Sequence, residues 1–193
     1  FPRLLLHQAA VRADQPAMRE KDLGIWQTWN WSQVSAEVRA LACGLAELGF
    51  RRGDNLAIIG DNRPRLYWAM AAAQCLGGVP VPMYQDAVAQ ELLFVLQDAE
   101  IKFAIVEDQE QVDKLLEVKD QCPQLAHILY DEPRGMRHYN QHFLHGLDEV
   151  QQMGRTHMRN HPEFVEAEIA QGSPEDVAIM LYTSGTTGKP KGV

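Results

Sequence analysis

The feature that most constrains the fold is a series of short, continuous apolar runs separated by stretches with helical periodicity. Three of these runs are residues 56–59, 103–106 and 126–130. A strand that is apolar on both faces is typical of a parallel sheet covered by helices. Between the runs, apolar residues recur at the three- and four-residue spacing of an amphipathic helix. The alternation predicts βαβ units, and hence an α/β fold with a mostly parallel sheet and helices on both faces.

Turn and cap signals set the expected boundaries of the elements. Asn62 is the expected N-cap of a helix that has Pro64 in its first turn. Pro80 and Pro82 imply that their strand lies at an edge of the sheet or pairs only over a very short length, because proline cannot donate a ladder hydrogen bond. The expected helices are 4–11, 32–48, 64–76, 88–98, 109–118, 143–153 and 163–171, and the expected extended segments are 27–31, 56–59, 79–82, 103–106, 126–130 and 177–182.

Composition narrows the class of protein. The chain has 193 residues, is 46% hydrophobic, and carries a net charge of -8. An acidic chain without a basic face argues against nucleic acid as a partner. No apolar stretch is long enough to span a bilayer, and no signal peptide precedes the first helix. Since the chain starts at Phe1 rather than at Met, we expect that residues upstream of it have been lost or left out.

Three cysteines, Cys43, Cys75 and Cys122, lie far apart and show no CxxC spacing. Such cysteines are expected to be buried free thiols, as in proteins of a reducing compartment. The sequence therefore predicts a soluble cytoplasmic protein.

The closing segment, LYTSGTTGKPKGV at residues 181–193, concentrates glycines, hydroxyls and lysines. Glycines let backbone N–H groups approach a phosphate closely, hydroxyls donate to its oxygens, and lysines supply positive charge. The pattern differs from a Walker A motif, which would require Gly in place of Thr183 and Ser or Thr in place of Pro190. We predict a phosphate-binding loop formed by Thr183, Ser184, Gly185, Thr186, Thr187, Gly188, Lys189 and Lys191.

The segment from Tyr182 to Val193 resembles the signature phosphate loop of the adenylate-forming superfamily, which includes acyl-CoA synthetases, peptide-synthetase adenylation domains and luciferases. Further segments also resemble that family; they are Thr28–Trp31, GDNLA at 53–57, NRP at 62–64 followed by Trp68, and GGVPVP at 77–82. Residues 106–116, 128–131 and 135–139 resemble bacterial long-chain fatty acid–CoA ligases in particular.

The resemblance implies a two-step reaction. A carboxylate attacks the α-phosphorus of ATP to give an acyl-adenylate and pyrophosphate, and CoA then displaces AMP. The predicted loop would hold the β- and γ-phosphates, and Thr186 would contact a water on Mg²⁺. The chain would supply no catalytic residue, and the family's adenine, ribose and hinge motifs and its C-terminal lysine would lie beyond Val193. We therefore expect this chain alone to be inert.

The resemblance also implies a division of the chain. Residues 1–172 would form the first α/β subdomain with a connector, and residues 173–193 would begin a second subdomain. The partners would be small molecules, namely ATP, a fatty acid and CoA. Peripheral membrane contact is compatible with this reading, and the oligomeric state is left open.

Two departures from the family pattern bear on the substrate. Arg65 stands where the family commonly has Glu, and Gln85 and Asp86 stand where long-chain members usually show Pro-Thr. Neither position belongs to the predicted loop, so these departures bear on the acid, and one alternative is an enzyme that activates an aryl, medium-chain or amino acid. The other alternative, from a different class, is a non-catalytic nucleotide-binding homologue.

Other clusters have simpler structural interpretations. The histidines have helical spacing but no acidic or Cys partner at ligand spacing, and we predict no metal site for them; they are His138, His142, His145, His157 and His161. The tryptophans at 26, 29 and 31 are expected to pack one face of a strand rather than bind a ligand. The acidic residues from Glu107 to Glu110 are expected to form the solvated first turn of a helix.

Overall fold

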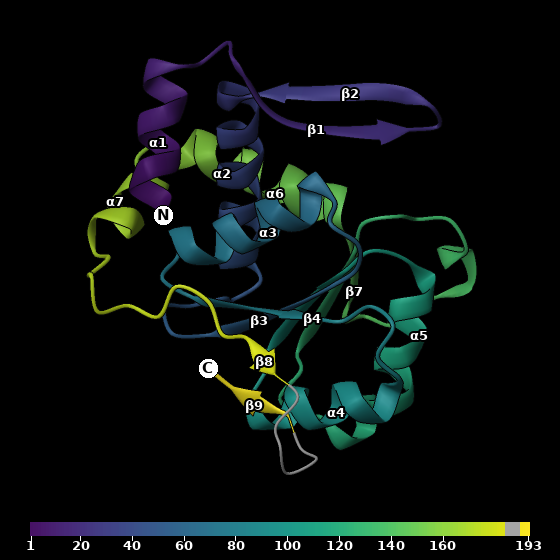
Figure 1. Cartoon of the computed structure of the whole chain (residues 1–193). Coiled ribbons are helices and arrows are strands. Elements are labelled where there is room, and N and C mark those ends of the chain that lie inside the picture. The colour runs from purple at the N-terminus through teal and green to yellow at the C-terminus, as the bar shows by residue number, and fades with distance from the viewer. Residues whose placement is uncertain (184–189) are drawn as a thin grey trace.

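The structure is a computed structural model that describes residues 1–183 and 190–193. Figure 1 shows a central sheet between helices, with one hairpin projecting from the body. In chain order the helices are α1 (Pro2–Val11), α2 (Trp31–Glu47), α3 (Pro64–Cys75), α4 (Ala89–Asp98), α5 (Gln109–Val118), α6 (Leu147–Asn160) and α7 (Phe164–Ala170). The strands are β1 (Pro16–Asp22), β2 (Ile25–Asn30), β3 (Asn55–Ile59), β4 (Val79–Met83), β5 (Phe103–Val106), β6 (His127–Tyr130), β7 (Leu144–Gly146), β8 (Tyr182–Thr183) and β9 (Lys191–Gly192).

The predicted α/β fold is confirmed. The central sheet has five strands in the order β4-β3-β5-β6-β7, and every neighbouring pair in it is parallel. Helices α2, α3 and α6 pack on one face and α4 and α5 on the other. The proline-containing strand β4 lies at the edge, as predicted.

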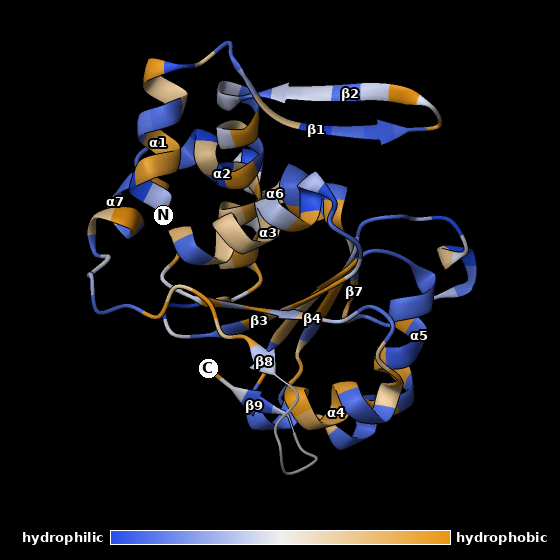
Figure 2. Ribbon diagram, in the orientation of Figure 1, coloured by the Kyte–Doolittle hydropathy of each residue, from blue (hydrophilic) through white to orange (hydrophobic). Residues whose placement is uncertain are grey.

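The continuous apolar runs are explained by burial on both faces. Leu56 and Ile58 of β3 join the core under α2 and α3, while Ala57 and Ile59 join the core under α4 and α5. Strand β5 alternates in the same way. In Figure 2 these strands are coloured hydrophobic along their length, between helices whose outer faces are hydrophilic. Two-sided burial removes the polar alternation that a one-sided sheet would show.

The strands that follow β3 in the chain lie on both sides of it in the sheet. Helix α3 leads from β3 to β4 on one side, whereas α4 leads from β4 past β3 to β5 on the other. The connections that follow β3 and β5 therefore leave the carboxyl edge of the sheet toward opposite faces. In open α/β sheets, this switch point is where ligands usually bind.

The prediction that Asn62 caps α3 is wrong. The N-cap is Arg63, whose side chain makes no cap hydrogen bond, and Pro64 is the first helical residue. A residue before proline is held in the extended region, which here places the start of the helix at Pro64 itself. The Asn62 carboxamide oxygen instead accepts a hydrogen bond from the Tyr67 hydroxyl at 3.1 Å.

The predicted strand at 177–182 is also wrong, because only Tyr182 of that range belongs to a strand. The segment runs beside β4 and makes one ladder-type bond to it, from Met180 N–H to the Pro80 carbonyl at 3.0 Å. Pro80 and Pro82 have no N–H to donate in return, so a continuous ladder cannot form along this edge.

Several other boundaries differ from the predictions. Strands β1 and β7 were not predicted, and α6 begins at Leu147 and continues to Asn160 rather than ending near residue 153. Trp29 packs edge-to-face on Trp68 with ring centroids 5.6 Å apart, as predicted. Trp26 is 59% exposed, so strand packing does not explain it.

The prediction of buried free thiols is confirmed. Cys43, Cys75 and Cys122 are free and buried. Burial raises the pKa of the Cys43 thiol to about 11 and that of the Cys75 thiol to about 12. Both thiols therefore stay protonated and unreactive at neutral pH.

Helices α2 and α6 cross at two glycines. A Cβ on Gly44 would overlap the backbone carbonyl of Val150, and one on Gly154 would overlap the backbone carbonyl of Ala40. The absence of a side chain at both positions lets the two helix backbones approach directly.

The variant Gly154→Ala should therefore be destabilised, although alanine in a helix normally gains about 1 kcal/mol over glycine. We expect a loss of about 1–3 kcal/mol in the free energy of unfolding, because the added methyl meets backbone rather than a movable side chain. Urea unfolding followed by circular dichroism measures it. The control is Gly146→Ser at the N-cap of the same helix, where an added Cβ would meet its nearest neighbour at 3.5 Å. A Gly154→Ala protein as stable as the control would refute the close crossing.

Candidate functional site

The two strands that flank the predicted phosphate loop pair directly with each other. Thr183 lies opposite Lys191 in the antiparallel pair β8–β9. Leu181 and Val193 extend the pairing by two backbone hydrogen bonds of 2.9 and 2.8 Å. Two of the eight predicted loop residues are thus cross-strand neighbours. The other predicted residues lie outside the described part of the chain; they are Ser184, Gly185, Thr186, Thr187, Gly188 and Lys189.

Contacts from α3, β4 and α4 hold this strand pair. The Tyr182 hydroxyl donates to the Asp98 carboxylate in α4 at 2.6 Å. Gln74 of α3 donates to the Ala178 carbonyl at 2.6 Å, just before the strand pair. Burial and the Asp98 carboxylate both raise the pKa of Tyr182 well above its ordinary value, so the hydroxyl remains a donor. The base of the predicted loop is therefore fixed beside the β4 edge of the sheet (Figure 1).

Lys191 is a described residue of the predicted loop that is suited to binding an anion. Its side chain is exposed. Within residues 1–183 and 190–193 its ammonium group makes no ion pair, whereas the charged side chains near the sheet are paired. An unpaired lysine beside the exposed Thr183 provides a point charge and a hydroxyl donor at one end of the predicted loop.

A hollow of about 330 Å³ opens at the carboxyl ends of β3 and β4. Its lining includes Tyr67, Met70 and Tyr84, together with the two residues that depart from the family pattern, Gln85 and Asp86. Tyr84 is 80% exposed, so the hollow is open to solvent in the described structure. Its position at the carboxyl edge is the usual place for a ligand in this class of fold.

An ion pair fills the switch point between β3 and β5. Glu107 accepts a hydrogen bond from the Asp61 N–H at 2.6 Å and pairs with the Arg63 guanidinium at 3.1 Å. A Cβ on Gly60 would lie 2.6 Å from the Glu107 Cβ, so glycine is required for this close approach. The prediction that residues 107–110 form a solvated turn is therefore wrong for Glu107. It holds for Asp108, which caps α5 by accepting the Glu110 N–H at 2.9 Å.

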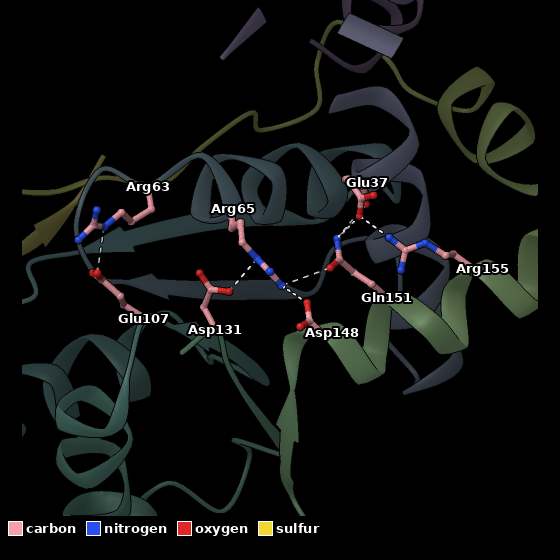
Figure 3. Close-up of polar contacts among 8 residues, drawn as sticks. All are labelled: Glu37, Arg63, Arg65, Glu107, Asp131, Asp148, Gln151 and Arg155. Carbon is pink, nitrogen blue, oxygen red and sulfur yellow. Dashed lines mark hydrogen bonds and ion pairs between the residues drawn. The ribbon is translucent and has the colours of Figure 1, made fainter. Parts of the chain in front are cut away.

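Arg65 lies at the centre of a polar network shown in Figure 3. Its guanidinium contacts the Asp131 carboxylate at 2.7 Å, the Asp148 carboxylate at 2.5 Å and the Gln151 carboxamide at 3.3 Å. These contacts join the start of α3, the carboxyl end of β6 and the first turns of α6. The sequence signalled this residue only as a departure from the family pattern.

The network continues into α2. Gln151 donates to the Glu37 carboxylate at 2.9 Å, and Arg155 donates to the same carboxylate at 2.6 Å (Figure 3). Gln151 is buried, so water cannot bind its carboxamide. Arg65 and Glu37 provide the hydrogen-bond partners of its oxygen and its nitrogen instead. No spacing in the sequence indicated these pairings, because Glu37 and Arg155 are 118 residues apart.

Asp131 has a perturbed carboxyl group despite its ion pair. Burial is the largest cause and raises its pKa from 3.8 to about 6, while Arg65 lowers it and Asp148 and Glu107 raise it. One guanidinium shared between two carboxylates does not offset the loss of water around Asp131.

This pKa predicts a pH-dependent stability that disappears in Asp131→Asn. Because the folded pKa lies above the unfolded one, the carboxyl's contribution to stability is fully present below about pH 4 and is lost as the pH rises through about 6. The free energy of unfolding of the wild type, minus that of the variant, should fall by about 2–3 kcal/mol over this range. Urea unfolding at a series of pH values measures the difference. Asp148→Asn removes the exposed partner of the same guanidinium and is the matched control. Parallel pH profiles for wild type and Asp131→Asn would contradict the assignment.

The described histidines make contacts with one another and with a carboxylate. Among the described residues no group of three or more His, Cys, Asp or Glu side chains is placed to hold a metal ion. His127 and His145 lie 3.0 Å apart across β6 and β7, and His157 hydrogen-bonds to Glu47 at 2.6 Å. In the part of the chain that the structure describes, no helix is both long and apolar enough to cross a bilayer.

Comparison with known proteins gives consistent matches over the whole chain. The family model described as AMP-binding enzyme matches residues 5–193. The long-chain-fatty-acid–CoA ligase ACSBG2 of Xenopus laevis is 30% identical over 199 residues, covering 100% of this chain and 26% of that protein. The long-chain-fatty-acid–CoA ligase FadD15 of Mycobacterium bovis is 30% identical over 171 residues, covering 88% of this chain and 26% of that protein.

A solved structure with the same fold is that of the anthranilate CoA ligase AuaEII in complex with anthranoyl-AMP. It has a TM-score of 0.81 and 23% sequence identity, and the match covers 100% of this chain and 33% of that one. The chain spans about a quarter of the length of the curated relatives that it matches.

Proposed function

Because the chain belongs to the AMP-binding enzyme family, we propose that the protein containing it activates a long-chain fatty acid with ATP and transfers the acyl group to CoA. The observation that carries this proposal is the strand pair β8–β9, which presents Thr183 and the exposed Lys191 at the two ends of the loop sequence. The named function of the 30% identical relatives supports the choice of acid.

The first step brings an anionic carboxylate to a polyanion, so its main obstacle is charge. Lys191, Lys189 and the loop hydroxyls would neutralise and orient the β- and γ-phosphates as pyrophosphate leaves. The exposed ammonium of Lys191, which forms no ion pair with the rest of the described residues, fits this role. Mg²⁺, held with the phosphates near Thr186, would supply further positive charge.

We assign residues 1–172 to a first subdomain and residues 173–193 to the start of a second one. The anchoring of the 173–193 segment on α3, β4 and α4 fits this division, because few elements of its own surround it. The acyl site, the adenine site and the completed reaction belong to the whole protein, and this chain alone is proposed to be inactive. Free buried thiols fit a cytoplasmic location.

One observation supports an alternative to a long-chain fatty acid as the substrate. Gln85 and Asp86 depart from the long-chain pattern and line the hollow at the carboxyl edge, and the AuaEII structure shows that this fold also serves an aryl acid. An aryl, medium-chain or amino acid is therefore the alternative substrate.

Carboxylate-dependent ATP–pyrophosphate exchange with the whole protein tests the function. We expect exchange that peaks with long-chain fatty acids in a panel of rising chain length that also holds aryl and amino acids. A peak at another acid would keep the adenylation and replace the substrate. Absence of exchange in a folded protein that binds ATP would identify a non-catalytic homologue.

Lys191→Ala is the variant that links this assay to the loop. Removing one charge-assisted phosphate contact should lower exchange roughly 10- to 100-fold. Thioester formation from supplied acyl-adenylate should change little, because pyrophosphate has already left. Lys119→Ala, at a surface lysine that stacks on Phe143, is the control. Equal losses in adenylation and in thioester formation would contradict the assignment of Lys191 to the phosphates of ATP.

Tyr182→Phe tests whether anchoring of the strand pair positions the loop. Loss of the hydrogen bond to Asp98 should weaken docking by about 1 kcal/mol, so the KM for ATP should rise about fivefold with a smaller change in kcat. Tyr139→Phe is the matched control, since its hydroxyl donates to Asp113 at 2.5 Å on another part of the surface. If both variants behave alike in steady-state kinetics, the Asp98 contact has no positioning role.

A further inference from the structure

The hairpin β1–β2 has an apolar tip that the rest of the described structure leaves uncovered. Leu23 is 92% exposed, Ile25 66% and Trp26 59%. Figure 1 shows the hairpin extending away from the helices, and Figure 2 shows hydrophobic colouring at the tip end of β2. Contiguous exposed apolar side chains on a projecting element indicate a binding surface.

An exposed leucine is unusual at its position in the hairpin turn. Asp22 pairs with Ile25, so Leu23 and Gly24 form a two-residue turn with φ values of +44° and +84°. Such turns favour Asn-Gly, because both residues adopt left-handed backbone. Leucine at the first position bears backbone strain and is almost fully exposed in the described structure.

The outer face of the hairpin combines an aromatic ring with cations. Lys21 lies opposite Trp26 and Arg19 opposite Thr28, so all four share one face of the two-stranded sheet. The Arg19 guanidinium carbon lies 5.3 Å from the centroid of the Trp26 ring. Neither β1 nor β2 places a carboxylate on this face.

The other face attaches the hairpin to the body and carries its acidic residues. Met18 and Trp29 pack on the core near α3. Glu20 lies 3.9 Å from the Arg63 guanidinium, and Asp22 stands beside Ile25 at the tip. From Met18 to Asp22 the strand advances about 13 Å at 3.3 Å per residue, which carries the tip beyond the helices.

We propose that this tip docks the protein on a phospholipid bilayer. Leu23, Ile25 and Trp26 enter the boundary between head groups and acyl chains, and Arg19 and Lys21 bind lipid phosphates. Tryptophan prefers that boundary, and basic residues beside it are attracted to the lipid surface. The chain as a whole has a charge of -8, so the cations of this face provide the local complementarity. The biological purpose rests on the proposed function, because long-chain fatty acids partition into bilayers.

The test measures partition of the whole protein onto mixed phosphatidylcholine–phosphatidylglycerol vesicles by co-sedimentation, without ATP or fatty acid. The double variant Leu23→Asn/Ile25→Thr should lower the partition coefficient about tenfold or more. Asparagine suits the left-handed turn position and threonine suits a strand, so the variant should fold at least as well as the wild type. Arg19→Gln and Lys21→Gln should each lower partition about fivefold.

Val88→Thr is the matched control, because Val88 is 58% exposed at the N-cap of α4, remote from the hairpin. Its partition should equal that of the wild type. Absence of vesicle binding by the wild type would overturn the proposal and indicate that another part of the protein or a second copy covers the tip. Vesicle binding that the tip variants do not weaken would also overturn it. Exchange activity with a soluble acid, measured without vesicles, reports on the proposed function separately.

Discussion

Helix α3 is the element on which the rest of the structure depends, because successive side chains along it hold parts that are distant in sequence. Arg63, just before the helix, contacts Glu107 at the end of β5 and Glu20 of the hairpin. Trp68 packs on Trp29 of the hairpin, and Gln74, near the other end, holds the segment that leads to the predicted loop. The helix can do this because its buried side rests on β3, which is itself buried on both faces.

The charged groups at the carboxyl edge follow from the same arrangement. Strands β3, β5 and β6 end at one edge, and their last residues bring Glu107 and Asp131 close to the start of α3. Two half-buried carboxylates there need cations, and Arg63 and Arg65 provide them at the cost of their own solvation. These carboxylates and guanidinium groups therefore largely neutralise one another's charge at this edge. An anionic substrate must find its positive charge elsewhere, and Lys191 is exposed and unpaired within the described residues.

The sequence predicted those features that depend on burial and on local chemistry. Strand β5 and helix α5 match their predicted bounds, because two-sided burial and a clear helical period set them. Features that depend on distant partners were missed. The strand predicted at 177–182 depends on donors that Pro80 and Pro82 lack. The network from Glu37 to Asp131 joins residues that have no regular spacing in the sequence. The α2–α6 crossing depends on Gly44 and Gly154, and the sequence does not show which glycines have a neighbouring backbone against them. For the site, the sequence predicted a phosphate-binding loop from its composition, whereas the anchoring of the flanking strand pair through Asp98 and Gln74 required the fold.

The positions of the hairpin β1–β2 and of the strand pair β8–β9 are compatible with the proposed enzyme if it docks on a membrane and uses a soluble nucleotide. Figure 1 places β1–β2 and the pair β8–β9 at opposite ends of the molecule. Docking through the hairpin tip would therefore leave the pair β8–β9 on the side that faces water. A polyanion such as ATP is repelled from an anionic lipid surface within about a Debye length, roughly 8 Å at physiological salt. An acyl chain, in contrast, has its highest concentration in the bilayer. The sheet and its helices separate the hairpin from the pair β8–β9. The acyl chain could therefore approach from the bilayer and ATP from water. Helix α3 contacts both the hairpin and the segment that leads to β8–β9.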